Sequence, residues 1–236
     1  MEFLGRKLRH ELKYYIHPLE YAMLRSRVSA LLPIDGHSGG REGYGIRSLY
    51  YDGPQDHALH DKNNGVFGRE KYRIRIYNGS DRVIKLERKS KFGDYVCKES
   101  AGLSRDQYDC LLAGDLKPFL RSEIKLVKEF VHAVSSRGFR PVTIVDYTRE
   151  AYTYEAGEVR ITFDKKLSGS VNSSDLFDPG IAFVEALEPT RTILEIKYNE
   201  FLPDMIRVLA QPSNAVRSTI SKYVLCRELG MIHFRR

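Results

Sequence analysis

The segment Lys71-Tyr72-Arg73-Ile74-Arg75-Ile76-Tyr77 alternates basic residues with apolar or aromatic ones. A period of two residues is that of a β-strand, in which successive side chains point to opposite faces. The three basic side chains therefore share one face of the strand, and Tyr72, Ile74 and Ile76 share the other. The segment predicts a strand with one strongly cationic face.

The same alternation recurs in five further segments, so each predicted strand is charged on one side. These faces could simply be the solvated side of an antiparallel sheet that packs on its other side. Arg73 and Arg75, however, lie roughly 7 Å apart along their strand, where their repulsion is about 0.6 kcal/mol in water but about 2.4 kcal/mol at an effective dielectric constant near 20. An enclosed face would need an anionic ligand. The five segments are Glu11-Leu12-Lys13, Lys85-Leu86-Glu87-Arg88-Lys89, Tyr147-Thr148-Arg149, Arg160-Ile161-Thr162-Phe163-Asp164 and Glu195-Ile196-Lys197.

Positive charge dominates the central strands, whereas a surface strand made for solubility intersperses both signs. Closing the sheet into a barrel would turn the charged faces inward and leave the apolar faces for helices to cover. Only a highly charged ligand would justify that arrangement. The pattern favours an enclosed phosphate channel with one metal ion.

Strand periodicity over about eight segments and helical periodicity over four predict an α+β fold, a large and mostly antiparallel sheet flanked by helices. Gly36 to Gly45 and Asn172 to Thr190 are predicted as long surface loops. The strand segments are Arg9 to Ile16, Arg47 to Asp52, Arg69 to Tyr77, Arg82 to Lys89, Asp94 to Ser100, Pro141 to Tyr154, Glu158 to Lys165 and Ile193 to Tyr198. The helical segments are Pro18 to Leu32, Pro118 to Val134, Leu202 to Ala210 and Asn214 to Glu228.

Length and charge bound the class of protein. The 236 residues contain no repeat and no linker-like stretch, so we expect residues 1–236 to form one domain. Lys and Arg number 38 against 31 Asp and Glu, a formal net charge of +7. This favours an anionic partner without separating nucleic acid from nucleotide, polyphosphate or acidic lipid.

The three cysteines, Cys97, Cys110 and Cys226, show no CxxC spacing and leave one unpaired in any disulfide scheme, which suits a reducing compartment. No apolar run approaches the length of a membrane span or has the layout of a signal peptide. We therefore expect a cytoplasmic protein with no transmembrane segment, and a membrane partner is left open.

Familiar catalytic motifs are absent from the sequence. It contains no GxxxxGK[ST] loop, no HRD or DFG element and no GxSxG elbow. His57 and His60 are spaced as a metal pair could be, but the segment Gly53 to Gly65 is predicted as a loop and offers no further ligand cluster. A metal role for the two histidines is disfavoured.

Eight short motifs in order resemble the VTC domain, the polyphosphate polymerase domain of the triphosphate tunnel metalloenzyme superfamily, which is CYTH-like. The resemblance runs from about Arg9 to Arg227, and its specificity lies in the ordered set rather than in any one motif. It implies a closed antiparallel barrel, the triphosphate tunnel fold, in the stand-alone bacterial-type form. The motifs are Arg9-His10-Glu11-Leu12-Lys13-Tyr14, Leu49-Tyr50-Tyr51-Asp52, Arg73-Ile74-Arg75, Lys85-Leu86-Glu87-Arg88-Lys89, Asp146-Tyr147-Thr148-Arg149, Val159-Arg160-Ile161-Thr162-Phe163-Asp164, Leu194-Glu195-Ile196-Lys197-Tyr198 and Ser221-Lys222-Tyr223.

The resemblance also implies the roles of individual residues. Glu195 would hold Mn²⁺ or Mg²⁺, which commonly takes only one or two carboxylates and completes its shell with waters and phosphates. The residues implied to grip the reacting phosphates are Arg73, Arg75, Lys85, Arg149 and Lys222. Those implied to line the tunnel and bind substrate are Lys13, Lys98, Tyr147, Arg160 and Ser221.

Each implied role has a plainer alternative. Lys13, Lys98 and Arg160 could be solvated strand residues, Tyr147 could only pack, and Glu195 could be an ion-pair partner. Whether the two other candidate ligands, Glu11 and Glu87, bind metal stays open, and Glu87 could instead pair with Lys85 or Lys89.

The hydrolytic branch of the superfamily opens with an ExExK motif, and here Arg9 stands in place of the first glutamate, leaving Glu11 and Lys13. Fewer carboxylates weaken a reaction that depends on a metal-activated water. The substitution therefore favours the polymerase.

Three functions remain: a metal-dependent polyphosphate polymerase that uses ATP, a metal-dependent triphosphatase or polyphosphatase on the same fold, and a non-catalytic binder of polyphosphate or nucleic acid. A nucleic-acid module would interleave exposed aromatics with its basic residues, whereas Tyr72 falls on the face opposite the arginines. No nucleic-acid partner is expected. The polymerase leads, with ATP and polyphosphate as partners.

Overall fold

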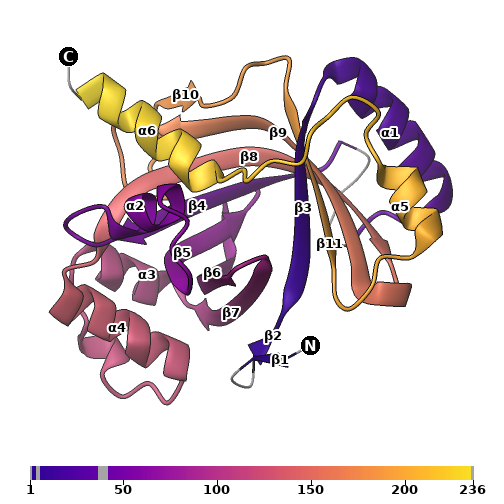
Figure 1. The fold of residues 1–236 in the computed structure, drawn as a ribbon. Helices are drawn as coiled ribbons and strands as arrows, with labels where there is room; N and C mark the ends of the chain where they lie inside the picture. Colours follow the sequence, from indigo (N-terminus) through magenta and orange to yellow (C-terminus); the bar gives the residue numbers. More distant parts are fainter. Residues whose placement is uncertain (1, 4–5, 37–41, 235–236) are drawn as a thin grey trace.

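The computed structural model describes residues 2–3, 6–36 and 42–234, and its centre is an antiparallel β-barrel (Figure 1). Around the barrel the strands follow the order β9, β11, β3, β7, β6, β5, β4 and β8, and β8 pairs again with β9 to close the ring. The predicted closed barrel flanked by helices is confirmed. The strands are β3 (Arg9–Ile16), β4 (Tyr44–Asp52), β5 (Arg69–Tyr77), β6 (Ser80–Phe92), β7 (Tyr95–Leu103), β8 (Arg140–Tyr154), β9 (Val159–Ser170) and β11 (Thr192–Tyr198).

Three short strands lie outside the ring. β10 (Phe183–Glu185) pairs with the end of β9, within the segment predicted as a loop from Asn172 to Thr190. β1 (Glu2–Phe3) pairs with β2 (Arg6–Lys7). Of the other predicted loop, Gly36 to Gly45, residues 37–41 lie outside the described part, and β4 already begins at Tyr44.

Register places the charged side chains on the inner face of the barrel. Arg73 is directly opposite Tyr50 of β4 on one side and Glu87 of β6 on the other. Residues directly opposite each other in an antiparallel pair share a face. The intervening residues, such as Ile74, point outward, as the alternation predicts, and are fully buried.

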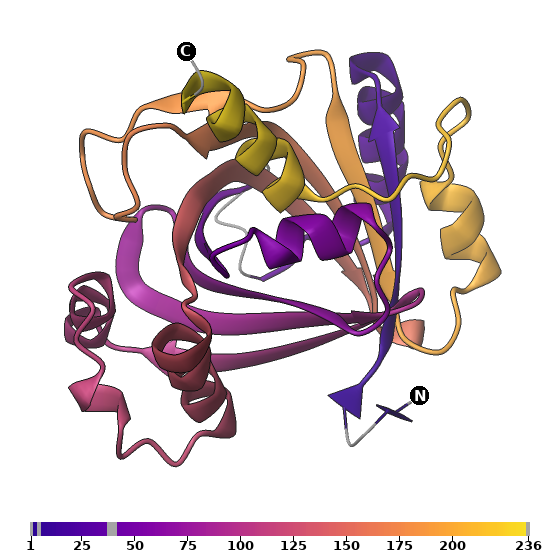
Figure 2. The same cartoon turned by 60° about the vertical axis from the view of Figure 1, so that its left-hand side comes forward.

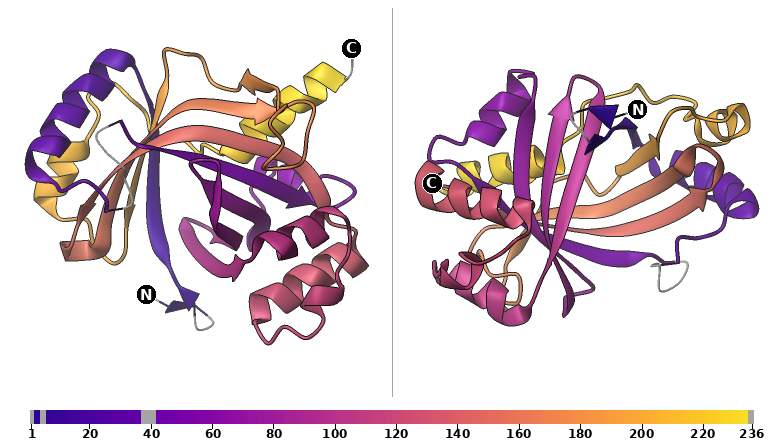
Figure 3. Two further views of the ribbon diagram at one scale, coloured as in Figure 1. Left: turned by 180° about the vertical axis from the view of Figure 1, so that it is seen from behind. Right: turned by 90° about the horizontal axis from the view of Figure 1, so that it is seen from below.

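Two pairs of helices cover the outer face (Figures 1 and 3). α3 (Arg105–Leu112) and α4 (Lys125–Arg137) pack their apolar side chains on the outward residues of β4 to β7. α1 (Pro18–Leu31) and α5 (Asp204–Ala210) cover β3, β9 and β11. The inner face is thus free to carry charge, because the outward apolar residues supply the core.

Two further helices, α2 (His57–Asn63) and α6 (Lys222–Phe234), lie side by side within the curve of the strands (Figure 2). Their apolar residues form a cluster with inward-pointing residues of β4 and β8, including Tyr50, Val145 and Tyr147. One part of the barrel interior is therefore packed and apolar. The charged side chains of the inner face lie outside this cluster.

The junction between β3 and β7 is the thinnest in the barrel, since its register contains only Arg9 with Val96 and His10 with Tyr95. Beyond it, the edge of β3 is met by the segment before α6, where the Ser218 amide donates to the Lys13 carbonyl at 2.9 Å. This contact brings the start of α6 to the barrel interior.

Three predicted helices begin later in the structure than the periodicity indicates, and two helices of the described chain were not predicted. The helix predicted from Leu202 begins at Asp204. The helix predicted from Pro118 begins at Lys125, after a single 3₁₀ turn at Lys117–Phe119. The helix predicted from Asn214 begins at Lys222, because residues 214–221 are drawn out along β3. The unpredicted helices are α2 and α3, of seven and eight residues, which are too short to show a helical period.

Among the described residues, no helix combines the length and the apolar character needed to cross a membrane.

Candidate functional site

Arg73 and Arg75 of β5 share one carboxylate inside the barrel. The Nε and Nη2 atoms of Arg73 lie 2.8 and 2.7 Å from Glu87 Oε2, and Nη1 of Arg75 lies 3.6 Å from the same oxygen. Lys98 Nζ lies 2.9 Å from the other oxygen, Oε1. Glu87 is fully buried, which alone would raise its pKa, but Arg75 and Arg73 hold that pKa far below its usual range. One negative charge therefore faces three positive ones.

Neutral hydroxyl groups fix the orientation of the two arginines. Arg73 Nη1 donates to the Tyr50 hydroxyl at 2.9 Å, and Arg75 Nε donates to Ser48 Oγ at 3.1 Å. Arg75 Nη2 also donates to the Tyr147 hydroxyl at 3.5 Å. Hydroxyl partners hold a guanidinium group in place without cancelling its charge. The positive charge of this group of residues therefore remains available to an anion.

Glu195 of β11 lies among three cations on the neighbouring part of the inner face. Lys13 Nζ is 3.3 Å from Glu195 Oε1, while Lys197 Nζ and Arg149 Nη2 are 3.2 and 3.4 Å from Oε2. Burial alone would raise the pKa of Glu195, but Lys197 and Lys13 hold it well below its usual range. Glu195 is therefore ionised at neutral pH.

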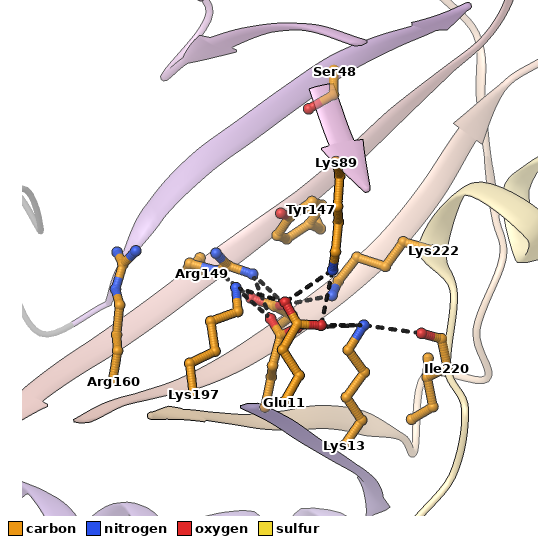
Figure 4. Close-up of polar contacts among 12 residues, drawn as sticks. Glu11, Lys13, Ser48, Lys89, Tyr147, Arg149, Arg160, Lys197, Ile220 and Lys222 are labelled. Atoms are coloured by element: carbon orange, nitrogen blue, oxygen red, sulfur yellow. Dashed lines mark hydrogen bonds and ion pairs between the residues drawn. The ribbon is translucent and has the colours of Figure 1, made fainter. Parts of the chain in front are cut away.

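Glu11 of β3 faces the same group of side chains, as Figure 4 shows. Lys89 Nζ contacts both of its oxygens, at 2.9 and 2.8 Å, and Lys13 Nζ lies 3.5 Å from Oε2. Burial would raise the pKa of Glu11, but Lys89 and Lys13 lower it to about 2. The Lys13 ammonium group thus bridges the carboxylates of Glu11 and Glu195.

Asp164 of β9 joins Arg149 to the first residue of α6. Arg149 Nε and Nη2 donate to the two Asp164 oxygens at 2.6 and 2.7 Å, and Lys222 Nζ lies 2.6 Å from Oδ2. The cations of Arg149 and Lys222 also lie over the Tyr147 ring, 5.3 and 5.1 Å from its centroid. Burial would raise the pKa of Asp164, but Arg149 and Lys222 lower it to about 2.

The remaining residues of the predicted site lie around this centre. Lys85 is directly opposite Arg75 in the register of β5 and β6. Arg160 pairs with Asp35 at 2.6 Å and donates to the Tyr44 hydroxyl, away from the centre (Figure 4). Ser221 Oγ accepts from Lys71 Nζ at 3.4 Å. The strand residues of the predicted site thus share the inner face of the barrel, with Arg160 away from the centre and Ser221 at the start of α6.

Sequence reasoning omitted three residues that belong to this cluster, Lys89, Lys197 and Asp164. Each was present in a quoted motif and in the right phase of its strand. Lys197 and Glu195 are two residues apart, a spacing that itself predicts a common face. Asp164 lay in the same alternation as Arg160, and its pairing with Arg149 follows from the register of β8 and β9.

No group of three or more His, Cys, Asp or Glu side chains with metal-binding geometry occurs in the described residues. The interior nevertheless offers oxygen ligands of the type that Mn²⁺ and Mg²⁺ use. Lys13 already places a positive charge between Glu11 and Glu195. Directly across from Glu195 in the register, Thr162 Oγ1 is buried and has no hydrogen-bond partner among the described residues. Glu195 and Thr162 would supply two oxygen ligands to a divalent cation that takes the rest of its shell from phosphate oxygens, and such an ion would displace lysine contacts that Glu195 makes in this structure.

The comparisons with known proteins agree with this geometry. The VTC domain family matches residues 8–229. No curated protein sequence matches the chain.

Among solved structures, the "putative adenylyl cyclase" of Hippeastrum, described as having a dominant triphosphatase activity, shares 14% identity with a TM-score of 0.51 and covers 94% of this chain and 95% of its own. The "putative adenylate cyclase" of Vibrio parahaemolyticus shares 13% identity with a TM-score of 0.51, and the match covers 93% of this chain and 98% of the Vibrio chain. These two likenesses show the barrel fold, and the family match covers nearly the whole chain. The chain belongs to the VTC domain family.

Proposed function

We propose that the chain is a metal-dependent polyphosphate polymerase that transfers the γ-phosphoryl group of ATP onto a polyphosphate chain inside the barrel. The observation that carries the proposal is the arrangement of Arg73 and Arg75, two inward-facing arginines that share the single buried carboxylate of Glu87. Family membership and the shared fold support the coarser part, an enzyme that acts on triphosphate or polyphosphate.

Enclosed cations of this density need counter-charge. Glu87 and Glu11 are each contacted by at least two cations: Glu87 by Arg73 and Lys98, and Glu11 by Lys13 and Lys89. Like charges about 7 Å apart repel by about 2.4 kcal/mol at a dielectric constant near 20. A polyphosphate chain carries about one negative charge per phosphate along its length, so it supplies counter-charge to every cation along the surface.

The mechanism requires alignment and charge neutralisation more than proton transfer. The terminal phosphate oxygen of the chain attacks the γ-phosphorus of ATP, the bond to the bridging oxygen breaks, and ADP leaves with that electron pair. The attacking oxygen is already ionised, so no general base is needed. Holding two polyanions in line and stabilising the charge of the transferring group accounts for the rate. In the proposed assignment Arg73, Arg75, Lys85, Arg149 and Lys222 grip the reacting phosphates.

The other proposed roles follow the position of each residue along the inner surface. Glu195 would hold Mn²⁺ or Mg²⁺ when bound, and the ion would neutralise charge on the phosphate oxygens. The residues proposed to bind the rest of the substrate are Lys13, Lys98, Tyr147, Arg160 and Ser221. ATP and polyphosphate are the proposed partners, the cytoplasm is the proposed location, and a partner at a membrane stays open.

A metal-dependent triphosphatase on the same barrel is the second candidate, favoured by the triphosphatase activity described for the Hippeastrum protein. Hydrolysis would need a carboxylate-held metal ion to activate water. Here Glu11, Glu87 and Glu195 are all engaged by lysine or arginine side chains. A bound metal ion would have to displace cations from these carboxylates in either reaction, but only hydrolysis also needs the ion to activate a water, because the attacking phosphate oxygen of the polymerase is already ionised. A polyphosphate-binding protein without catalysis is the third candidate.

The test is to incubate the purified chain with ATP and Mn²⁺ and to resolve the products on a gel that displays polyphosphate ladders. We expect a ladder with ADP, which Arg73→Ala and Glu195→Ala abolish. Arg105→Ala, which removes an arginine from the outer helix α3, is the matched control and should leave the ladder intact. Phosphate release without a ladder would establish the triphosphatase, and tight polyphosphate binding without turnover would leave the binding protein.

A further inference from the structure

Lys71 of β5 lies two residues before Arg73, on the same inner face. It is directly opposite Lys89 in the register, so two lysines face each other across β5 and β6. Its Nζ atom lies 3.4 Å from Ser221 Oγ and 4.5 Å from the centroid of the Tyr223 ring. Lys71 therefore meets the start of α6 where Ser221 and Lys222 enter the barrel.

No carboxylate forms an ion pair with Lys71 in the described part of the chain. Asp52 is the negative charge that acts on Lys71, but its oxygens are already hydrogen-bonded. Oδ2 accepts from the Tyr223 hydroxyl, and Oδ1 accepts from the amides of Gly53 and Ala58 at 2.7 and 2.8 Å. The partners of Lys71 are thus a hydroxyl group and an aromatic ring.

The charged groups around Lys71 are mostly positive. Lys89 faces it from β6, Arg69 from its own strand and Lys13 from β3, while Asp52 of β4 is the opposing charge. Burial, Lys89 and Arg69 lower the pKa of Lys71 to about 7.

Lys13, also inside the barrel, has the carboxylate partners that Lys71 lacks, although partners alone do not set a lysine pKa here, since burial lowers that of Lys197 to about 7 beside Glu195. Burial would lower the pKa of Lys13 too, but the charges of Glu195 and Glu11 raise it above the ordinary value. The two lysines therefore differ in their partners, and Lys71 lacks the negative charge that Lys13 has.

We propose that Lys71 and Ser221 form an additional phosphate-binding position beside Arg73, and that a phosphate bound there draws a proton from water onto the Lys71 amine. The inference rests on the proposed function, because the phosphate belongs to a polyphosphate chain inside the barrel. The bound phosphate supplies the missing negative charge and accepts hydrogen bonds from the ammonium group and the Ser221 hydroxyl. Binding and protonation are then linked.

The link has a defined sign and size. Below pH 7 the amine is already protonated, and binding is independent of pH at this position. Above pH 7 the proton must be taken from water, so affinity falls by about tenfold for each unit until the raised pKa of the complex is reached. With a free pKa of about 7, the contribution of Lys71 to affinity falls about tenfold between pH 6 and pH 8.

The test is a calorimetric titration of long-chain polyphosphate into the full chain without ATP, at pH 6, 7 and 8 and in two buffers of different ionisation enthalpy. Long chains are used because few of their phosphates are terminal groups that titrate in this range. The variants are Lys71→Arg, which keeps the positive charge but does not titrate in this pH range, and Lys71→Met, which removes the charge altogether. Thermal melting establishes that each variant folds.

Between pH 6 and pH 8, we expect the affinity of the natural chain for polyphosphate to fall by a factor about ten times larger than the factor for Lys71→Arg. On binding at pH 7, the natural chain should take up about half a proton more than Lys71→Arg does. Lys71→Met should bind more weakly than the natural chain at pH 6. Equal pH dependence in the natural chain and Lys71→Arg, or unimpaired binding by Lys71→Met at pH 6, would overturn the inference while leaving the polymerase in place. Absence of polyphosphate binding in every chain would overturn both.

Discussion

Replacing Glu87 by Gln removes the one carboxylate that Arg73 and Arg75 share. The side chain is fully buried, and the substitution preserves its shape while leaving Arg73, Arg75 and Lys98 without their counter-charge. Breaking a buried ion pair in this way costs about 3–5 kcal/mol of the free energy of unfolding. For a chain of 236 residues, each kcal/mol lowers Tm by about 2–4 °C, so we expect a fall of about 6–20 °C.

Polyphosphate should reverse much of this loss, because its phosphates replace the missing negative charge. A ligand at 100 times its Kd stabilises a protein by about 2.7 kcal/mol. The gain should be larger for Glu87→Gln than for the natural chain, in which the carboxylate competes with phosphate for the same arginines. The assay is thermal melting with and without polyphosphate.

Glu150→Gln is the matched control for the Glu87 experiment. Glu150 is also fully buried and holds cations, with Arg25 Nε at 2.6 Å and Lys165 Nζ at 3.2 Å, but it points to the outer side of β8 under α1. Its loss should destabilise the chain, and polyphosphate should restore no more than it adds to the natural chain. Equal rescue of both variants, or no destabilisation by Glu87→Gln, would refute the reasoning.

Three further predictions follow from the same geometry. Arg73→Ala should lower the transfer rate by about 10²–10³-fold, as for loss of one buried transition-state donor, because its side chain is only 13% exposed. Lys98→Ala should lower it by less than about 5-fold, because the Lys98 side chain is 48% exposed and solvent screens its charge. Steady-state rates that ranked the two variants the other way would contradict this. The pKa of Glu11 is about 2 in the folded chain and about 4.3 in the unfolded chain. The ionised Glu11 therefore contributes fully to the free energy of unfolding above about pH 4.3, and this contribution is lost as pH falls toward 2. Urea melts of Glu11→Gln should therefore converge with those of the natural chain in acid, and a constant difference would count against the assignment. Chelation of divalent ions should abolish transfer but leave polyphosphate binding measurable by calorimetry, since lysine and arginine side chains hold the chain; loss of both together would show that the metal ion carries the binding.

The strands could be predicted from sequence because the inner and outer faces differ so strongly. Arg69 to Tyr77 was predicted with the bounds that the structure shows, since cations and apolar residues alternate along all of it. The start of the last helix was predicted wrongly at Asn214, because the helical periodicity of this segment competes with its pairing to β3. That contact is not visible in the sequence. α3 carried a readable signal, a capping box between Ser104 and Gln107, that periodicity alone overlooks.

The candidate site was predictable to the extent that it follows strand phase. Lys13, Arg73 and Glu195 were placed on inner faces from alternation and family resemblance, and the structure brings Lys13 and Glu195 into contact. Which cation meets which carboxylate depends on register and closure, so the sharing of Glu87 and the position of Lys71 emerge only from the fold. The roles of these residues in catalysis stay predictions, as does the organisation of residues 1–236 as one domain.

A crystal structure of the chain with a short polyphosphate and Mn²⁺ tests the central claim most directly, because the claim is that the inner face of the barrel holds the polyanion. We predict phosphates in a row along that face, in hydrogen-bonding contact with Arg73, Arg75 and Arg149, and with Mn²⁺ at Glu195. Polyphosphate bound only to the outer surface, with Arg73 and Arg75 still paired to Glu87 and no anion beside them, would contradict it.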